Sequence, residues 1–586
     1  MIDHHLASLL CLGLLSGPVC LASTSADEDL ERYFRAYLDA DCRAHPTMAT
    51  QLGDHRFDDQ LDDVTAKARA RWLEQVRATL AELPTRIAYP QLSRNAQIDY
   101  EIFRDHLERT LALTQMEHPF EEDPRVYVDL ITDSVYRLFM QSTVPRATTI
   151  RNAIARINAA PAVLDIARQT LTHPPRVVVE TASQQNRGAI AFLTTDLLAL
   201  EGDTDQREEL MAASARLVMA LRQHQQFLDL ELMPRATGSW RIGPERFARK
   251  LGLVLQVDCD ADRLVADARA AIARIQGGMA VIARQLWSSV CPERALPSDD
   301  PAGTRALITT VLEHIGRDHG TATSLSSDAQ ATLAGIKAFI VAHRIVQLPE
   351  PDHLQVVTMP EFQRGNTVAD LSAAPPLDAE ATSIYAISPP PQGWDAERVE
   401  GFLAEYNRRM LQMLSIHEAY PGHHLQLTRA NRLPSLVRKV LGSGVYMEGW
   451  AVYCEQMMLD QGYGEGDCAL RLVHLKYDLR SAANAILDHD LHCTAMDDAQ
   501  ALHLLMDEAY QTRGEALLKI RRAQQGSCQL STYFVGQHAF ADLRRAVQCR
   551  QGERFDLLRF HEALIAHGAV PIRYLPELVQ QDLGDG

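Results

Sequence analysis

Residues 417–424 read His-Glu-Ala-Tyr-Pro-Gly-His-His, and the rest of the chain can be understood as the scaffold around this octet. The octet follows directly on residues 400–416, whose apolar side chains recur at the 3.6-residue period of a helix. Three histidines and a carboxylate are rarely gathered within eight residues by chance, and both residue types bind metal ions. The octet therefore predicts a metal site at the end of a helix.

The spacing of the histidines predicts that this helix is interrupted. In the common His-Glu-x-x-His motif, two histidines four residues apart face one metal, whereas here the fourth residue after His417 is Pro421. On a continuous helix His423 would point about 120° away from His417, and His424 would lie roughly 10 Å further along the axis. A break at Pro421 and Gly422 can return His423 to His417. We therefore expect His423 to be the second ligand and keep His424 as the alternative.

A third ligand is expected from residues 444–455, which read Gly-Val-Tyr-Met-Glu-Gly-Trp-Ala-Val-Tyr-Cys-Glu. A carboxylate beside so much apolar surface is costly unless it is paired or bound to a metal. Glu448 is the preferred ligand, because it lies far enough after His423 for a second helix to pack on the first, and Glu455 is the other candidate. This mixed nitrogen and oxygen set suits one Zn²⁺ ion. Glu418 is then predicted to be the general base.

Helical periodicity runs through most of the chain. The exception is the stretch 348–394, which is rich in proline and carries short β-branched runs. We predict an all-α, mainly helical fold, with two lobes around a deep cleft and a small β-hairpin or ladder near residues 350–390. One helical domain would span residues 27–586, with a possible N-terminal lobe over 27–240 and a catalytic lobe over 241–586.

Charge and the start of the chain limit the possible partners. The 58 basic and 76 acidic residues give a formal net charge of −18, which argues against a nucleic-acid partner because nucleic acids bind basic surfaces. Residues 1–26 have the apolar stretch of a signal peptide or lipoprotein leader. We expect an exported protein that is either periplasmic or anchored in the membrane as a lipoprotein, and a membrane partner only through a lipid on Cys20.

Two segments of the chain resemble the bacterial domain of unknown function 885 family: HEAYPGHHLQ at residues 417–426 and YMEGWAVYCE at residues 446–455. Members of that family resemble zinc metallopeptidases. They are distantly similar to the all-helical peptidases of the thimet oligopeptidase and Taq carboxypeptidase type. The resemblance implies the same ligands and the same general base as the spacing argument, with the metal in a deep groove.

The resemblance also implies a role for a late tyrosine. Residues 531–536, Ser-Thr-Tyr-Phe-Val-Gly, resemble the family's Tyr-x-x-Gly segment. By analogy with the helical oligopeptidases, Tyr533 would donate a hydrogen bond to the oxyanion that forms during hydrolysis.

A second late segment, Asp-His-Asp-Leu-His at residues 488–492, resembles the family's Asp-x-Gly-x-His segment. There Asp488 and His492 would bind substrate or support the site, and His492 is a candidate catalytic residue. The family has an arginine four residues before that aspartate, where this chain has Asn484. Arg480, one turn earlier, is expected to form a surface salt bridge, with anchoring of a substrate carboxylate as the alternative.

Together these features predict a zinc-dependent hydrolase of peptide bonds whose substrates are short peptides. The alternative is an exported peptide-binding protein that holds no metal or is catalytically silent on the same scaffold. A di-metal carboxylate protein would need paired Glu-x-x-His motifs on separate helices. The chain has one such motif, at residues 350–353 in the proline-rich stretch, so this third class is disfavoured.

Overall fold

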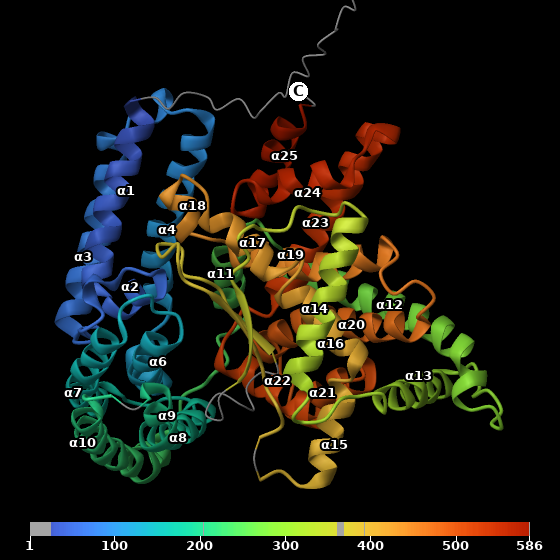
Figure 1. Ribbon diagram of the computed structural model, residues 1–586, viewed down its shortest axis with the longest axis horizontal. Coiled ribbons are helices and arrows are strands. Elements are labelled where there is room, and N and C mark those ends of the chain that lie inside the picture. The colour runs from blue at the N-terminus through green and yellow to red at the C-terminus, as the bar shows by residue number, and fades with distance from the viewer. Residues whose placement is uncertain (1–24, 203, 360–368, 392, 585–586) are drawn as a thin grey trace, which may run out of the picture.

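The computed structural model of the protein describes residues 25–202, 204–359, 369–391 and 393–584. Helices make up most of this part (Figure 1), which confirms the predicted all-α class. The predicted leader, including Cys20, falls almost entirely outside the described residues. Within the described part, no helix combines the length and the apolar character needed to span a bilayer.

The first ten helices occupy one side of the molecule in Figure 1, in two stacked groups. Serine or threonine side chains cap the long helices of the first group: Thr65 accepts a hydrogen bond from the Ala68 amide and Ser93 from the Ala96 amide. The first group is α1 (Ser25–Ala44), α2 (Pro46–Leu52), α3 (Ala66–Arg86) and α4 (Arg94–Met116), and the second is α5 (Pro119–Glu122), α6 (Arg125–Met140), α7 (Arg146–Thr170), α8 (Arg176–Ala191), α9 (Leu197–Glu201) and α10 (Arg207–Gln226).

Buried apolar side chains form two main clusters. The smaller one is drawn from Val64 and residues 127–232. The larger one contains side chains of α1, α3 and α4 together with those of residues 247–583. The first group of helices therefore shares its core with the second half of the chain.

The second half of the chain supplies the helices that surround the octet (Figure 1). Within it, α12 packs along α20 and α19 packs along α23. These helices are α11 (Pro244–Leu255), α12 (Ala261–Val290), α13 (Pro301–Gly316), α14 (Leu325–Ala342), α15 (Ala396–Glu405), α16 (Arg408–Glu418), α17 (His423–Asn431), α18 (Leu436–Val440), α19 (Gly444–Asp460), α20 (Cys468–Cys493), α21 (Asp498–Leu502), α22 (Arg513–Gln525), α23 (Ser531–Gln551), α24 (Leu557–Ile565) and α25 (Leu575–Leu583).

The predicted β element is a three-stranded sheet of β1 (Leu354–Thr358), β2 (Ala369–Ser372) and β3 (Ser383–Ile387), in the order β1-β3-β2. The β2–β3 pair is antiparallel, as in a hairpin, whereas β1 and β3 are parallel, with Val356 opposite Tyr385. The central strand β3 is buried along its whole length. The Tyr385 hydroxyl lies 3.3 Å from the Ser415 hydroxyl on α16, so the sheet supports the helix that ends in the octet.

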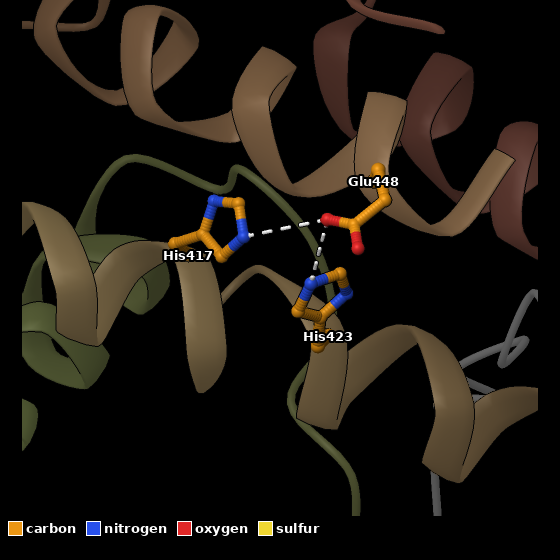
Figure 2. Close-up of side chains that lie close together, drawn as sticks. All are labelled: His417, His423 and Glu448. Atoms are coloured by element: carbon orange, nitrogen blue, oxygen red, sulfur yellow. Dashed lines mark ion pairs between the residues drawn. The ribbon is translucent and has the colours of Figure 1, made fainter. Parts of the chain in front are cut away.

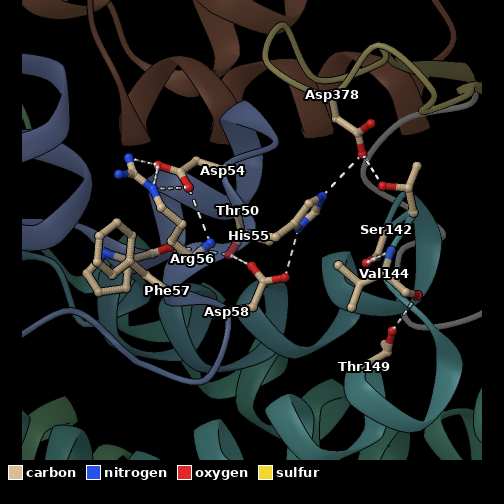
Figure 3. A network of polar contacts seen from close by, with 12 residues as sticks. Thr50, Asp54, His55, Arg56, Phe57, Asp58, Ser142, Val144, Thr149 and Asp378 are labelled. Carbon is tan, nitrogen blue, oxygen red and sulfur yellow. Dashed lines mark hydrogen bonds and ion pairs between the residues drawn. The ribbon is translucent and has the colours of Figure 1, made fainter. Parts of the chain in front are cut away.

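A second histidine and carboxylate group joins α2 to the connection between β2 and β3 (Figure 3). His55 Nδ1 lies 2.8 Å from Asp58 Oδ2 and His55 Nε2 lies 3.2 Å from Asp378 Oδ2. Thr50 and Thr143 donate further hydrogen bonds to the two carboxylates, at 2.7 Å and 2.6 Å. We refer to His55, Asp58 and Asp378 as the His55 cluster.

Candidate metal centre

Helix α16 delivers His417 and Glu418 at its last turn. Asn407 starts the helix by accepting hydrogen bonds from the amides of Arg409 and Met410. The helix ends at Glu418, and the next helix, α17, begins at His423. The interruption predicted from the Pro421-Gly422 pair is therefore present.

Two features fix the path of the chain between the helices. The Gly422 amide donates a hydrogen bond to the Ile416 carbonyl at 3.0 Å, and a Cβ at Gly422 would overlap the carbonyl oxygens of Ile416 and His417. Only glycine fits this close approach. The fully buried Trp450 of α19 donates from its indole nitrogen to the Pro421 carbonyl at 2.9 Å, which ties the break to the neighbouring helix.

His417, His423 and Glu448 converge from α16, α17 and α19, and we call them the triad (Figure 2). The Glu448 Oε2 atom lies 3.7 Å from His417 Nε2 and 3.5 Å from His423 Nε2. One ligand atom from each residue lies within 4.8 Å of the other two. Ligand atoms about 2.0–2.1 Å from a tetrahedral zinc are about 3.3 Å apart. The triad therefore has the donor types and nearly the spacing of three zinc ligands.

Glu455, the other candidate ligand, instead contacts the far side of His417. Its Oε1 lies 2.7 Å from His417 Nδ1, and the carboxylate is fully buried. A proton on Nδ1 shared with this carboxylate leaves Nε2 as the nitrogen that faces the triad. Burial raises the pKa of Glu455 to about 7, with His417 opposing that rise.

His417 and Glu448 of the triad stabilise one another's charged forms. Burial opposes the charged form of Glu448, but His417 and His423 outweigh it and hold the pKa of this carboxyl far below its usual range. Burial likewise disfavours a charged His417, but Glu448 and Glu455 raise its pKa well above the ordinary value. The two carboxylates thus make this pocket favourable for positive charge.

His424, the alternative second ligand, is turned away from the triad. Its Nε2 lies 3.2 Å from Asp352 Oδ1, and its ring packs edge-on against Tyr420 at 5.1 Å between centroids. Tyr420 also donates to Asp352, and Lys337 Nζ pairs with it at 2.7 Å. His424 therefore anchors the break to the proline-rich stretch, and His423 is the histidine that joins His417.

Glu418 lies next to His417 with a partly accessible side chain. Burial raises the pKa of Glu418. His417 and His423 oppose that rise, and Asp370 of β2 and Glu448 add to it. A carboxylate with a raised pKa beside two imidazoles has the properties of a general base.

Tyr533 lies near the crossing of α23 with α19, the helix that carries Glu448. The helices approach so closely that a Cβ on Gly449 or Gly536 would overlap the backbone of the other helix. Glu448 precedes Gly449, and Tyr533 lies one turn before Gly536, so both residues sit at the crossing. Burial and then Glu448 raise the pKa of Tyr533 to about 12, with Arg522 opposing them, so the phenol is protonated at neutral pH.

Residues 46–579 match the family described as "Bacterial protein of unknown function (DUF885)". The chain belongs to the DUF885 family. A solved structure of a candidate lipoprotein of unknown function from Shewanella oneidensis is 30% identical, with a TM-score of 0.78 over 94% of this chain and 99% of that one. A candidate lipoprotein from Colwellia psychrerythraea is 18% identical, with a TM-score of 0.77 over 96% and 100% of the two chains, and it shows the fold alone. A comparison with curated proteins gave no significant match.

In this DUF885 protein, sequence reasoning missed Tyr477 of α20. Its ring packs edge-on against His417 at 6.2 Å between centroids, and the Arg480 guanidinium lies 5.1 Å from the same ring. The expected salt bridge of Arg480 is present, with Glu515 of α22, but its predicted surface position is wrong, since the Arg480 side chain is only 12% exposed. A tyrosine at helical spacing from an arginine is common, so nothing in the sequence indicates that the Tyr477 ring packs on His417.

His492, predicted as catalytic from the family resemblance, lies away from the triad. It follows Tyr477 along α20 by about 22 Å at ~1.5 Å per residue, and its ring packs between Trp240 and Phe247. Its Nε2 contacts the Ala523 carbonyl at 2.8 Å. His492 therefore supports the turn before α23 rather than the metal centre.

Asp488 has a structural position as well. It is fully buried and accepts hydrogen bonds from the amides of Cys528 and Ser531, at 2.8 Å and 3.2 Å, and from the Ser531 hydroxyl at 2.9 Å. These contacts fix the start of α23, two residues before Tyr533. Asp488 thus positions the helix that carries the tyrosine.

Proposed function

We propose that this DUF885 protein is a zinc-dependent hydrolase of peptide bonds that acts on short peptides. The observation that carries the proposal is the triad: two imidazoles and one carboxylate from three helices, at spacings that suit a tetrahedral ion. Three protein ligands leave a fourth position open, which is the arrangement of catalytic zinc sites.

His417, His423 and Glu448 would hold the metal, and Glu455 would orient His417 through its other ring nitrogen. The donor set of two nitrogens and one oxygen suits zinc better than magnesium or calcium. A zinc ion bound there supplies Lewis acidity to the substrate carbonyl and to a water molecule.

Glu418 and Tyr533 would carry the proton transfer and the charge stabilisation. Glu418 would take the proton of the attacking water and return it to the leaving amine nitrogen. Tyr533, protonated at neutral pH, would donate a hydrogen bond to the oxygen on which negative charge develops.

Export is part of the same proposal. Residues 1–26 have the pattern of a leader, and the 30% identical Shewanella protein is described as a candidate lipoprotein. We propose that the chain works outside the cytoplasm, either periplasmic or anchored through a lipid on Cys20. The net charge of −18 is consistent with a partner other than nucleic acid.

The test compares wild type with Glu418→Gln in the digestion of a library of short peptides, after loading with zinc. We expect wild type to bind one zinc ion and cleave. The variant should keep the zinc and lose at least ~10²-fold in rate, as expected for removal of a general base. The control is Glu397→Gln, the same change at an exposed position on α15.

Equal turnover of wild type and Glu418→Gln would remove the assigned role. A wild-type protein that holds no stoichiometric zinc and cleaves nothing after zinc addition, yet still binds peptides, would favour the binding-protein alternative.

A further inference from the structure

One face of α22 carries three charged residues beside the candidate metal centre. Glu515, Lys519 and Arg522 are spaced four and three residues apart, so they lie within about 60° of one another around the helix. Lys519 is half-buried and Arg522 is exposed.

One end of this face reaches a tyrosine of the centre through Arg480, and the other end contacts a tyrosine directly. Glu515 pairs with Arg480, whose guanidinium lies against the ring of Tyr477, which packs on His417. At the other end, the Arg522 Nη2 atom lies 3.4 Å from the hydroxyl of Tyr533. Lys519 lies between these two residues on the same face of α22.

The electrostatic environment of Lys519 agrees with this placement. Burial and the neighbouring Arg480 and Arg522 lower the pKa of Lys519, and Glu448 of the triad opposes them. The ammonium group is therefore within the field of a triad residue and of two other cations.

The charges on this face are not balanced within the described residues. Arg480 has Glu515 as its partner. Among the residues that the structure describes, Lys519 has no hydrogen bond or ion pair, and Arg522 contacts only the neutral groups of Gln529, at 2.8 Å, and Tyr533. Two neighbouring cations with no carboxylate in direct contact repel each other, and an incoming anion would relieve that repulsion.

We propose that Lys519 and Arg522 form a subsite for the C-terminal carboxylate of a peptide whose scissile bond lies at the triad. The protein would then be an exopeptidase that acts at the C-terminus of a peptide, because Arg522 contacts Tyr533, the tyrosine that would bind the oxyanion. Arg480 is a positioning residue in this arrangement, since its charge is already paired. The inference rests on the proposed peptidase function.

The first experiment measures kcat/KM of the zinc-loaded protein for one short peptide and for the same peptide with a C-terminal amide. We expect at least about a tenfold preference for the free acid, as for a charge-assisted contact. Lys519→Gln and Arg522→Gln should each reduce that preference, mainly through KM for the free acid. Lys519→Arg, which keeps the charge, should retain part of the preference.

Arg521→Gln is the matched control, because residue 521 lies about 200° around α22 from Lys519. It should keep the wild-type preference. Thermal unfolding of each variant checks that the fold is intact.

The second experiment separates this subsite from the chemistry. Glu418→Gln should bind peptides without cleaving them, so calorimetry can compare the acid with the amide in this background. Tighter binding of the acid that disappears with Lys519→Gln supports the subsite even if no turnover is found. Equal cleavage of acid and amide by wild type, with equal binding, would overturn the subsite and leave the peptidase proposal standing.

Discussion

The triad and the His55 cluster both combine histidine with carboxylates but differ in the spacing of these groups. In the His55 cluster both ring nitrogens lie within 3.2 Å of a carboxylate oxygen, so the histidine is held by hydrogen bonds. In the triad the shortest imidazole-to-carboxylate distance is 3.5 Å, which is too long for a good hydrogen bond and suits atoms that share an ion. The difference teaches that a candidate metal site is distinguished by gaps between donor atoms, rather than by the presence of histidine and carboxylate.

The clusters also differ in how their histidines are supported. His417 has a buried carboxylate on Nδ1 and directs Nε2 to the triad. Both ring nitrogens of His55 contact carboxylates, so neither is left to bind a metal ion. We therefore expect substitutions in the first cluster to change zinc binding, and substitutions in the second to change stability alone.

Removal of a triad histidine should have the largest effect. His423→Ala deletes one of three ligands, and we expect zinc affinity to fall by roughly a thousandfold or more, together with activity. The measurement is a competition titration with a zinc chelator. The adjacent His424→Ala is the matched control, because His424 contacts Asp352, and it should keep zinc affinity within a few-fold. A larger loss in His424→Ala than in His423→Ala would reverse the ligand assignment.

Replacing the glycine next to each cluster by alanine tests whether the path of the backbone matters as much as the ligands. In Gly422→Ala the added atom overlaps two carbonyl oxygens of α16. We expect a loss of about 3 kcal/mol or more in unfolding free energy, and zinc binding that is weakened because His423 moves. Urea unfolding and a zinc titration measure the two effects.

Gly53→Ala is the counterpart. Gly53 has φ of 84°, and its Cβ would lie 2.7 Å from Asp378 Cβ. We expect it to destabilise the protein but to leave zinc affinity unchanged. Loss of zinc binding in Gly53→Ala would show that the two regions are coupled.

The local parts of the centre could be predicted from the sequence because helical geometry is local. The break at Pro421-Gly422 follows from the angle and the rise per residue, and the pairing of His423 with His417 follows from that break. Glu448 was predicted because a carboxylate in an apolar helix needs a partner. The all-α class was predictable for the same reason, since the periodicity extends along almost the whole chain.

The remaining parts depend on contacts between distant segments, which spacing does not encode. His424 is fixed by Asp352 from the proline-rich stretch, and Arg480 is paired with Glu515 of another helix. His492 resembled a family segment, but its place near the end of the long helix α20 carries it away from the triad. A motif match locates a residue in the chain, and helix packing decides what that residue faces.

Loss of the carboxylate behind His417 should have a smaller effect than loss of a ligand. Glu455→Gln keeps the size of the side chain but removes the charge that holds the proton on Nδ1. We expect zinc affinity to fall by about 10- to 100-fold, as for other partners of metal-bound histidines. Chelator competition gives the value, and Asp378→Asn, which changes a carboxylate of the His55 cluster, provides the control. An unchanged zinc affinity in Glu455→Gln would mean that the contact of Glu455 with Nδ1 does not orient the His417 ring.

The smallest expected effect is a pH-dependent contribution of His55 to the free energy of unfolding. The hydrogen bond with Asp58 raises the pKa of His55 from 6.5 to about 9, with burial opposing and Asp378 assisting. Because the folded-state pKa is the higher one, the stabilisation is fully present below pH 6.5 and is lost as the pH rises through about 9. After a discount for partial solvent exposure, we expect wild type to exceed His55→Gln by about 2 kcal/mol in unfolding free energy at pH 6, and by little at pH 10. Denaturant titrations across this range measure the difference, and one that stays constant with pH would mean that His55 acts by packing rather than by charge.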